Sequence, residues 1–264
     1  MSLTDCSQAD VATSQVGSQT AAELQEGVGL EASGGGHHED GGTFNRLVWL
    51  ADAYLELIGV EDRELALARP FGRAVVQALD ERGGGLVTYA LVDDDLDLTV
   101  AALHAAGSAI GPVTRGSRRR GDNELVEYWT AQPEEIGPDH VPLLIQHAYS
   151  GAEWNREAVE ARAAFAHPLG SPALMVRLDL ATDDPPTMAG IYAEQLGLEF
   201  WAVADLAVCT VGRHTIRLVP RREMQVPAVV TLGAEIELPR SAPALGMRFD
   251  VEYVDLRLPT PNRA

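Results

Sequence analysis

One pattern occurs three times along the chain and limits what it can fold into. In residues 86–107 an alternating apolar strand runs into an acidic turn, and a short amphipathic helix then ends at Gly107. Residues 174–197 repeat this order, with proline at the start of the helix and glycine at its end, which are the usual positions of these residues. Residues 11–29 hold a weaker copy, whose strand has lost most of its apolar residues. Such internal similarity predicts a fold built from repeated units.

After each helix the apolar period changes from 3.6 to 2, which indicates strands. A glycine-rich segment (34–36) follows the first helix and an arginine-rich turn (118–120) follows the second. The expected strands are 44–50 and 54–60, then 125–131 and 141–148, and finally 200–206, 207–211 and 215–219. Each unit therefore has the order β-α-β-β-β, and the fold class is α+β.

The connecting segments set the expected boundaries. Residues 69–82 read as a helix that ends at three glycines, and 153–166 read as a second connecting helix. Residues 226–256 are rich in strand-forming residues, do not match the repeat, and could extend the third sheet. We expect a domain over 9–150 made of units 9–62 and 85–149 joined by helix 69–82, a linker over 151–172, and a third unit over 173–258.

Composition excludes several classes of function. Acidic residues outnumber basic ones 39 to 20, for a net charge of -19, which disfavours nucleic acid and anionic membranes as partners. Every basic residue is arginine, so lysine Schiff-base chemistry and a P-loop lysine are excluded. Two cysteines provide no disulfide framework, and Cys209 reads as a core residue. Without a signal peptide or an apolar run of about 20 residues, a cytoplasmic protein is expected.

Local motifs carry a family resemblance. Gly35–His38, Gly42–Asn45 and Tyr54–Ile58 resemble the core signature of glyoxalase-like domains, and Ser117–Arg120 and Pro142–His147 fit the same family. The chain thus resembles the vicinal-oxygen-chelate (glyoxalase/bleomycin-resistance/dioxygenase) superfamily over 10–150, and more loosely over 167–220. The resemblance implies paired units whose curled mixed sheets form a half-barrel around a small-molecule cavity. This fold hosts lyases, isomerases, dioxygenases, transferases and drug-binding proteins.

The resemblance also implies where a metal would bind. In metal-bearing members the ligands come from the first and fourth strands of each unit. Glu56 and Gln146 occupy the fourth-strand positions here, whereas the first strands offer no histidine, only Thr13, Ser14 and Gln15 in one unit and Thr88 and Tyr89 in the other. A divalent ion bound by Glu56 and Gln146 would lack the usual histidine ligands. The sequence is therefore also consistent with a site that binds no metal.

Glu56 and His38 are the candidate catalytic residues. Glu56 stands between leucines, so its carboxylate either faces the cavity as a base or metal ligand, or turns outward or pairs with an arginine. His38 and Asp40 have the H-x-D spacing of two-histidine-one-carboxylate iron sites. Chance also produces this spacing, and the glycines around it favour a solvated or lid-like loop, from which His38 could still act as acid or base.

The candidate substrate-binding residues lie on strands and on the arginine-rich turn. Thr43 and Asn45 share one strand face, where they would contact a ligand or simply begin the strand. Arg118 and Arg120 would clamp a carboxylate or phosphate, or offset nearby acidic residues such as Asp122 and Glu124. Tyr128 would form a pocket wall or part of the core. Gln146 would ligate or orient substrate, and His147 would then face the opposite side of its strand.

Two functions follow. The first is a lyase, isomerase or dioxygenase-type enzyme that uses Glu56 on a small molecule. The alternative is a non-catalytic protein that binds a drug or toxin.

A third unit without a fourth would expose apolar surface and strand edges, so we expect a homodimer in which the third units complete each other, or a third unit packed on the first two.

Overall fold

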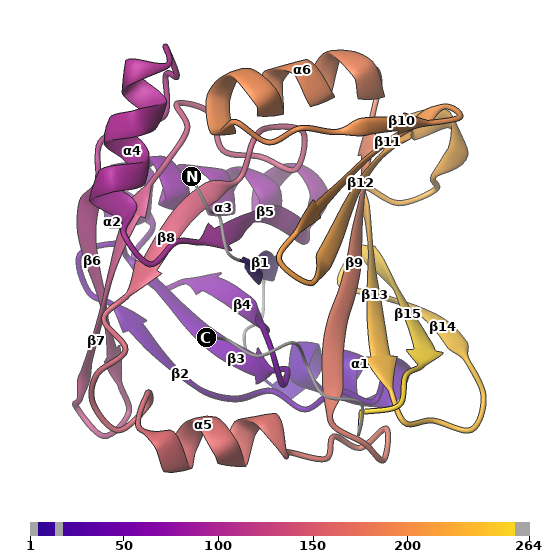
Figure 1. Cartoon of the computed structure of the whole chain (residues 1–264). Helices are drawn as coiled ribbons and strands as arrows, with labels where there is room; N and C mark the ends of the chain where they lie inside the picture. Colours follow the sequence, from indigo (N-terminus) through magenta and orange to yellow (C-terminus); the bar gives the residue numbers. More distant parts are fainter. Residues whose placement is uncertain (1–4, 14–17, 257–264) are drawn as a thin grey trace.

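The computed structural model describes residues 5–13 and 18–256. Two βαβββ units form the first half of the molecule, and a second sheet lies beside them (Figure 1). The first unit consists of β1 (Asp5–Thr13), α1 (Ser18–Gly27), β2 (Ser33–His38), β3 (Thr43–Trp49) and β4 (Tyr54–Val60). After α2 (Arg63–Leu67) and α3 (Pro70–Arg82), the second consists of β5 (Gly84–Val92), α4 (Leu96–Ala105), β6 (Thr114–Arg120), β7 (Leu125–Ala131) and β8 (Leu143–His147).

The strands of these two units close into an eight-stranded barrel in the order β1-β4-β3-β2-β6-β7-β8-β5. The first strand of each unit pairs parallel with the fourth, β1 with β4 and β5 with β8. Antiparallel pairs join the units along both seams, β1 with β5 and β2 with β6. The predicted α+β fold of repeated βαβββ units in curled mixed sheets is therefore confirmed. β1 begins at Asp5, ahead of the stretch in which the strand was expected, and Ser14 and Gln15 lie outside the described residues.

The second sheet has seven strands in the order β10-β11-β12-β9-β13-β15-β14. Its third unit consists of β9 (Ala173–Thr182), α6 (Pro185–Leu196), β10 (Trp201–Val203), β11 (Leu206–Val211) and β12 (His214–Pro220). Strands β13 (Ala228–Ala234), β14 (Arg240–Ala244) and β15 (Met247–Tyr253) follow. Because β13 pairs parallel with β15 and β15 antiparallel with β14, they reproduce the first, fourth and third strands of a unit without its helix and second strand.

Residues 228–253 thus form a truncated fourth unit, which corrects the expectation of a third unit without a fourth. The third unit also packs on the barrel, since one apolar cluster contains residues of both halves. Polar contacts join them too: the hydroxyls of Tyr89 and Tyr192 lie 2.8 Å apart, and Asp52 accepts a hydrogen bond from the Met175 amide at 3.0 Å. The homodimer remains a prediction.

Helix ends follow local sequence signals. α3 has Pro70 in its first turn and ends at Gly83 with a φ of 72°, and α6 ends the same way at Gly197 with a φ of 64°, so both predicted glycine stops are confirmed. The second connecting helix is shorter than expected, because Asn155 caps α5 (Arg156–Ala163) through a bond from the Ala158 amide. Glu153 therefore lies in the loop before α5.

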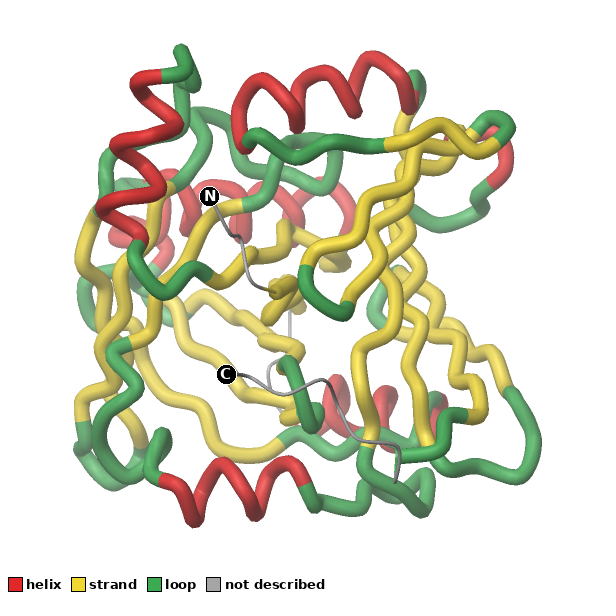
Figure 2. Tube along the Cα trace, viewed as in Figure 1, coloured by secondary structure: helices red, strands yellow, loops and turns green. Residues whose placement is uncertain are grey.

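The tube in Figure 2 shows the barrel strands on one side and the open second sheet on the other, with helices above and below. Cys209 is buried in the second half, as predicted for a core residue. None of the helices in the described part of the chain is long and apolar enough to cross a membrane.

Candidate functional site

The interior of the barrel encloses a cavity of about 630 Å³. Alternate residues of β3, namely Thr43, Asn45, Leu47 and Trp49, line it, as strand alternation requires. On β4 the lining residues are Tyr54 and Glu56, and on β8 they are Leu143, Ile145 and His147. Arg118 and Tyr128 are among the lining residues of β6 and β7. The cavity therefore combines apolar side chains with polar and charged ones that could orient a ligand.

Glu56 is buried on the cavity wall and accepts a hydrogen bond. The Asn45 side chain donates through Nδ2 to Glu56 Oε1 at 2.5 Å. The Gly36 amide in turn donates to Asn45 Oδ1 at 2.9 Å. Because the amide oxygen of Asn45 is engaged by a backbone donor, its nitrogen must point at Glu56, and Glu56 must accept. Glu56 is thus held on the cavity wall as a hydrogen-bond acceptor.

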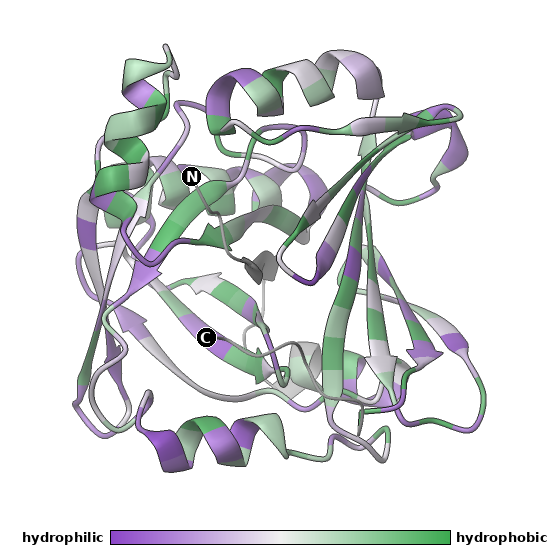
Figure 3. Ribbon diagram, in the orientation of Figure 1, coloured by the Kyte–Doolittle hydropathy of each residue, from purple (hydrophilic) through white to green (hydrophobic). Residues whose placement is uncertain are grey.

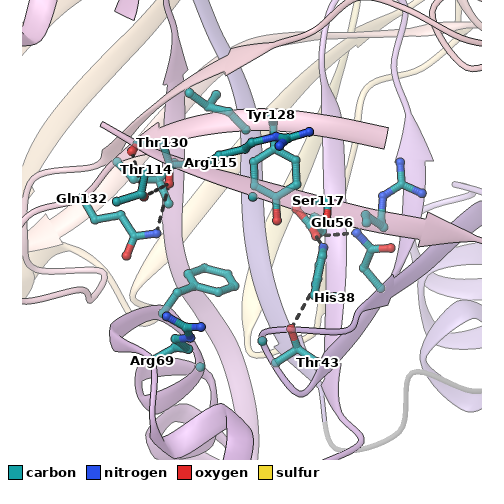
Figure 4. A pocket seen from close by; sticks show the side chains of 18 of the residues that line it. His38, Thr43, Glu56, Arg69, Thr114, Arg115, Ser117, Tyr128, Thr130 and Gln132 are labelled. Carbon is teal, nitrogen blue, oxygen red and sulfur yellow. Dashed lines mark hydrogen bonds and ion pairs between the residues drawn. The ribbon is translucent and has the colours of Figure 1, made fainter. Parts of the chain in front are cut away.

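His38 is the last residue of strand β2, and its side chain lies beside Glu56 of β4. It is therefore not in a lid or solvated loop, as its glycine-rich context suggested. Its Nε2 is 3.6 Å from Glu56 Oε1, and its Nδ1 is 3.0 Å from Thr43 Oγ1. Burial lowers the pKa of His38 below its usual value; the nearby Glu56 carboxylate opposes this shift and Arg118 adds to it. The ring is therefore neutral near pH 7. Figure 4 shows the hydroxyl of Tyr128 pointing toward this pair.

The glycines before His38 mark close contact between strands. Gly36 lies between β3 and β6, and a Cβ atom there would be 2.2 Å from the Arg119 carbonyl oxygen. Gly35 has a φ of +101°, and a Cβ atom there would be 2.1 Å from the Asn45 carbonyl oxygen. Since only glycine fits at both positions, the glycine run permits the seam between β2 and β6 to form.

The arginine-rich segment is strand β6, not a turn. Arg118 is buried, and its Nη2 donates to both carboxylate oxygens of Glu153, at 2.6 and 2.8 Å. Arg120 does not line the cavity; it pairs with Asp122 at 3.0 Å and approaches Glu124. Arg120 also lies 3.6 Å from Glu153, so the two arginines share this carboxylate, although only Arg118 lines the cavity.

Aromatic rings cluster near Arg118 at one end of the cavity. The ring of His147 lies 4.8 Å from that of Trp154 and 6.0 Å from that of Tyr54, measured between centroids. The guanidinium of Arg162 stacks 4.0 Å from the Trp49 ring centre, within cation–π range. Burial lowers the pKa of His147 to about 3, and the positive charge of Arg118 acts in the same direction. This end of the cavity is therefore aromatic, with a neutral histidine.

Gln146 lies on the face of β8 away from the cavity, contrary to expectation. Its Oε1 accepts a hydrogen bond from the Leu96 amide at 2.9 Å, at the start of α4. His147 takes the cavity position instead. The parity of this strand could not be read from sequence, because Leu143, Leu144 and Ile145 are all buried and show no alternation. Figure 3 shows the same uniformly hydrophobic strand, with hydrophilic residues only at its tip.

The other end of the cavity carries polar side chains, and its lining includes Arg69 and Arg115 (Figure 4). Gln132 Nε2 donates to Thr130 Oγ1 at 3.3 Å, and Thr114 Oγ1 donates to the Thr130 carbonyl at 3.2 Å. Tyr128 stands between the two ends and covers Gly116, where a Cβ atom would be 2.4 Å from the tyrosine ring. Gly116 therefore lets the tyrosine ring lie flat against β6.

A glyoxalase-like domain model matches residues 12–196, well over half of the chain. The chain belongs to the glyoxalase-like domain family. The predicted membership of the vicinal-oxygen-chelate superfamily is thereby confirmed. No curated protein sequence gives a significant match.

Solved structures share the fold of this glyoxalase-like protein. A hypothetical protein from Staphylococcus aureus aligns over 94% of this chain and 98% of its own, with 14% identity and a TM-score of 0.73. A variant of 4-hydroxymandelate synthase from Streptomyces coelicolor aligns over 88% and 71%, with 12% identity and a TM-score of 0.51. A variant methylmalonyl-CoA epimerase from the same organism aligns over 56% and 99%, with 18% identity and a TM-score of 0.42.

The described residues of this glyoxalase-like protein do not fit the metal set that the superfamily implies. Among them, no three histidine, cysteine, aspartate or glutamate side chains gather closely enough to hold an ion. Of the two expected ligands, Glu56 lies in the cavity with His38 as neighbour, while Gln146 binds the backbone of α4. Catalytic zinc sites use three protein ligands, one more than Glu56 and His38 supply.

Sequence reasoning missed His147, Glu153 and Trp154 as cavity residues. Glu153 and Trp154 were assigned to a connecting helix, yet they precede the Asn155 cap and line the cavity. The Asn-x-x-Ala pattern at the helix start was the available signal for the cap. Nothing local revealed the contact of Glu153 with Arg118, since 35 residues separate the two.

Proposed function

We propose that this protein is an enzyme that transfers a proton within a small organic substrate held in the barrel cavity, with Glu56 as the general base. The observation that carries the proposal is the fixed chain from the Gly36 amide through Asn45 to Glu56. It holds the carboxyl group of Glu56 in one orientation on the cavity wall. A base held in this way has its geometry set before substrate binds.

Proton abstraction next to a carbonyl group suits this arrangement. Glu56 takes the proton from carbon, the electron pair of the broken C–H bond moves toward the carbonyl, and an enolate oxygen forms. When Thr43 Oγ1 donates to His38 Nδ1, the ring carries its proton on Nε2, on the side of Glu56. His38 then donates a hydrogen bond to the enolate oxygen. Return of the proton from Glu56 to carbon completes an isomerisation or exchange.

The test is incorporation of deuterium from solvent, because it reports proton abstraction even when substrate and product are identical. The protein is incubated in D2O with a panel of 2-oxo acids, 3-oxo acids and the matching amides, and loss of the C–H signal is followed by proton NMR. We expect Glu56→Gln to slow exchange by about 10²–10⁴-fold, the usual contribution of a positioned base. Glu160→Gln, on the exposed surface of α5, is the matched control and should leave exchange unchanged.

Equal exchange in wild type and Glu56→Gln would overturn the assignment of the base. Compounds that bind in the cavity with none of them exchanging would overturn the proposed reaction and favour a small-molecule-binding protein. Glu56→Asp sharpens the result, because it keeps the charge and shortens the reach. It should retain a measurable fraction of the wild-type rate only if the carboxylate itself takes the proton.

A further inference from the structure

Two N–H donors of residues on the cavity wall have no acceptor among the described residues. Among the described residues, three buried side-chain polar atoms lack a hydrogen-bond partner, and two of them, Arg118 Nη1 and Trp154 Nε1, belong to residues that line the cavity. Leaving such a donor unpaired costs free energy comparable to a lost hydrogen bond, and more for a charged group. Both groups can only donate, so their joint complement is a molecule that presents acceptor oxygens.

The guanidinium of Arg118 is hydrogen-bonded on one side only. Its Nη2 is fixed by Glu153 while Nη1 has no partner, and the side chain is 5% exposed. The pairs of β2 with β6 are Gly36 with Arg120 and His37 with Arg119. Continued by one residue, this antiparallel register would bring Arg118 opposite His38 of the proposed catalytic pair, and the charge of Arg118 does act on His38.

Trp154 is anchored in the same region. Its ring lies 4.8 Å from the His147 ring and 5.0 Å from the Tyr149 ring, and Arg162 lies 5.1 Å from its centre. Trp154 also directly follows Glu153, the residue that holds Arg118. The indole is therefore fixed by packing on several sides, and its N–H direction is set before a ligand arrives.

We propose that Arg118 Nη1 and Trp154 Nε1 bind the carboxylate of the substrate, which makes the substrate class a small oxo-carboxylate anion. Two N–H donors match the two oxygens of one carboxylate. Arg118 and Arg120 share the single charge of Glu153, so a positive charge remains that suits an anion, and we expect a carboxylate with its two oxygens to match the two donors. The identity of the reacting group rests on the proposed function, whereas the carboxylate subsite does not.

Binding can be tested without turnover. Protein labelled with ¹⁵N-tryptophan gives one indole N–H signal for each of its four tryptophans, and Trp154→Phe assigns the signal of Trp154. The probes are pyruvate, phenylpyruvate and benzoate, each titrated against its amide, together with inorganic phosphate. We expect the carboxylates to shift the Trp154 signal downfield and to bind at least about tenfold more tightly than the amides.

Two variants distinguish the loss of an N–H donor from the loss of the folded structure. Trp154→Phe keeps an aromatic ring but removes the N–H, and should weaken carboxylate binding about tenfold. Arg118→Lys keeps the charge for Glu153 but lacks the second nitrogen, and should also abolish the preference over amides. If Arg118→Lys does not fold, the double variant Arg118→Gln/Glu153→Gln removes both charges together and should bind carboxylates and amides equally.

The possible results distinguish the carboxylate subsite from the proposed reaction. Equal affinity for carboxylates and amides, absence of carboxylate binding at millimolar concentration, or phosphate binding as tightly as carboxylate would each overturn the inference. Glu56→Gln should still bind carboxylates with the same preference. Preserved binding without deuterium exchange in any protein would therefore refute the proposed reaction and leave the carboxylate subsite standing.

Discussion

The barrel and the second sheet are built from the same unit, yet they use their buried charges differently. In the barrel, Glu56 is held by the neutral Asn45 and faces a cavity. In the second sheet, Asp179 is also buried, but Arg177 and Arg217 donate to its two carboxylate oxygens. The neutral Asn45 positions Glu56 on the cavity wall, whereas two arginines neutralise the charge of Asp179 within the second sheet.

The two halves differ because the barrel contains two complete units, whereas the second sheet contains one complete and one truncated unit. Two full units supply eight strands that close on themselves, so their inward residues converge. The fourth unit lacks its helix and second strand, and the seven-stranded sheet therefore stays open. Helix α1 of the first unit packs beside β14, where Glu23 accepts a hydrogen bond from the Leu245 amide at 2.7 Å. Closure of the sheet, more than the presence of a carboxylate, distinguishes the half that holds the site.

The largest expected effect comes from breaking the barrel seam. Gly36→Ala places a Cβ atom against the Arg119 carbonyl, so β2 and β6 must separate, at a cost of about 4 kcal/mol. The matched control is Gly190→Ala in the second half, because that position on α6 has open space around it. Alanine there should stabilise the protein by about 0.5–1 kcal/mol. Urea unfolding measures the stability of both variants. Equal changes in the free energy of unfolding would show that the seam between β2 and β6 does not require glycine at position 36.

Asp179→Asn should act on stability and leave chemistry intact. The substitution removes the charge that two arginines share and should cost about 3 kcal/mol of unfolding free energy. Per folded molecule, deuterium exchange should stay at the wild-type rate, because Asp179 belongs to the second sheet. A parallel loss of exchange and stability would show that the two halves are not functionally distinct.

Acid should weaken the barrel through His147. Its pKa is about 3 in the folded protein and 6.5 ordinarily, so below pH 6.5 the unfolded chain binds a proton that the folded chain does not. Stability should fall as pH decreases from 6.5 toward 3, with a loss of about 2 kcal/mol at pH 5 from this residue. Burial lowers the pKa of His38 and His167 as well, so the comparison is between wild type and His147→Gln. Identical pH dependence of urea unfolding in the two proteins would contradict the shift.

Sequence periodicity predicted most of the fold because strands and helices leave local signals. The strand 54–60 and the strand 125–131 agree with the structure residue for residue, and the helix expected over 69–82 begins one residue later. The truncated fourth unit was not recognised, because without a helix its three strands carry no change of period. Its membership in the second sheet depends on pairing between β9 and β13, 46 residues or more apart.

The site was only partly predictable, for physical reasons that differ among residues. Glu56 stood out as a carboxylate among leucines, but its inward direction could not be read from a strand that is buried on both faces. Glycines were interpreted as a loop, whereas Gly35 and Gly36 allow neighbouring strands to approach His38. The Arg118–Glu153 pair joins a strand to a distant loop, and only the folded chain brings the two together.

The most direct test of the difference between the two halves is the rate of deuterium exchange in Glu56→Gln and Asp179→Asn, measured side by side and divided by the folded fraction of each protein. The structure predicts a loss of about 10²–10⁴-fold in Glu56→Gln and a wild-type rate in Asp179→Asn. Equal rates in the two variants would contradict the assignment of the reaction to the barrel cavity.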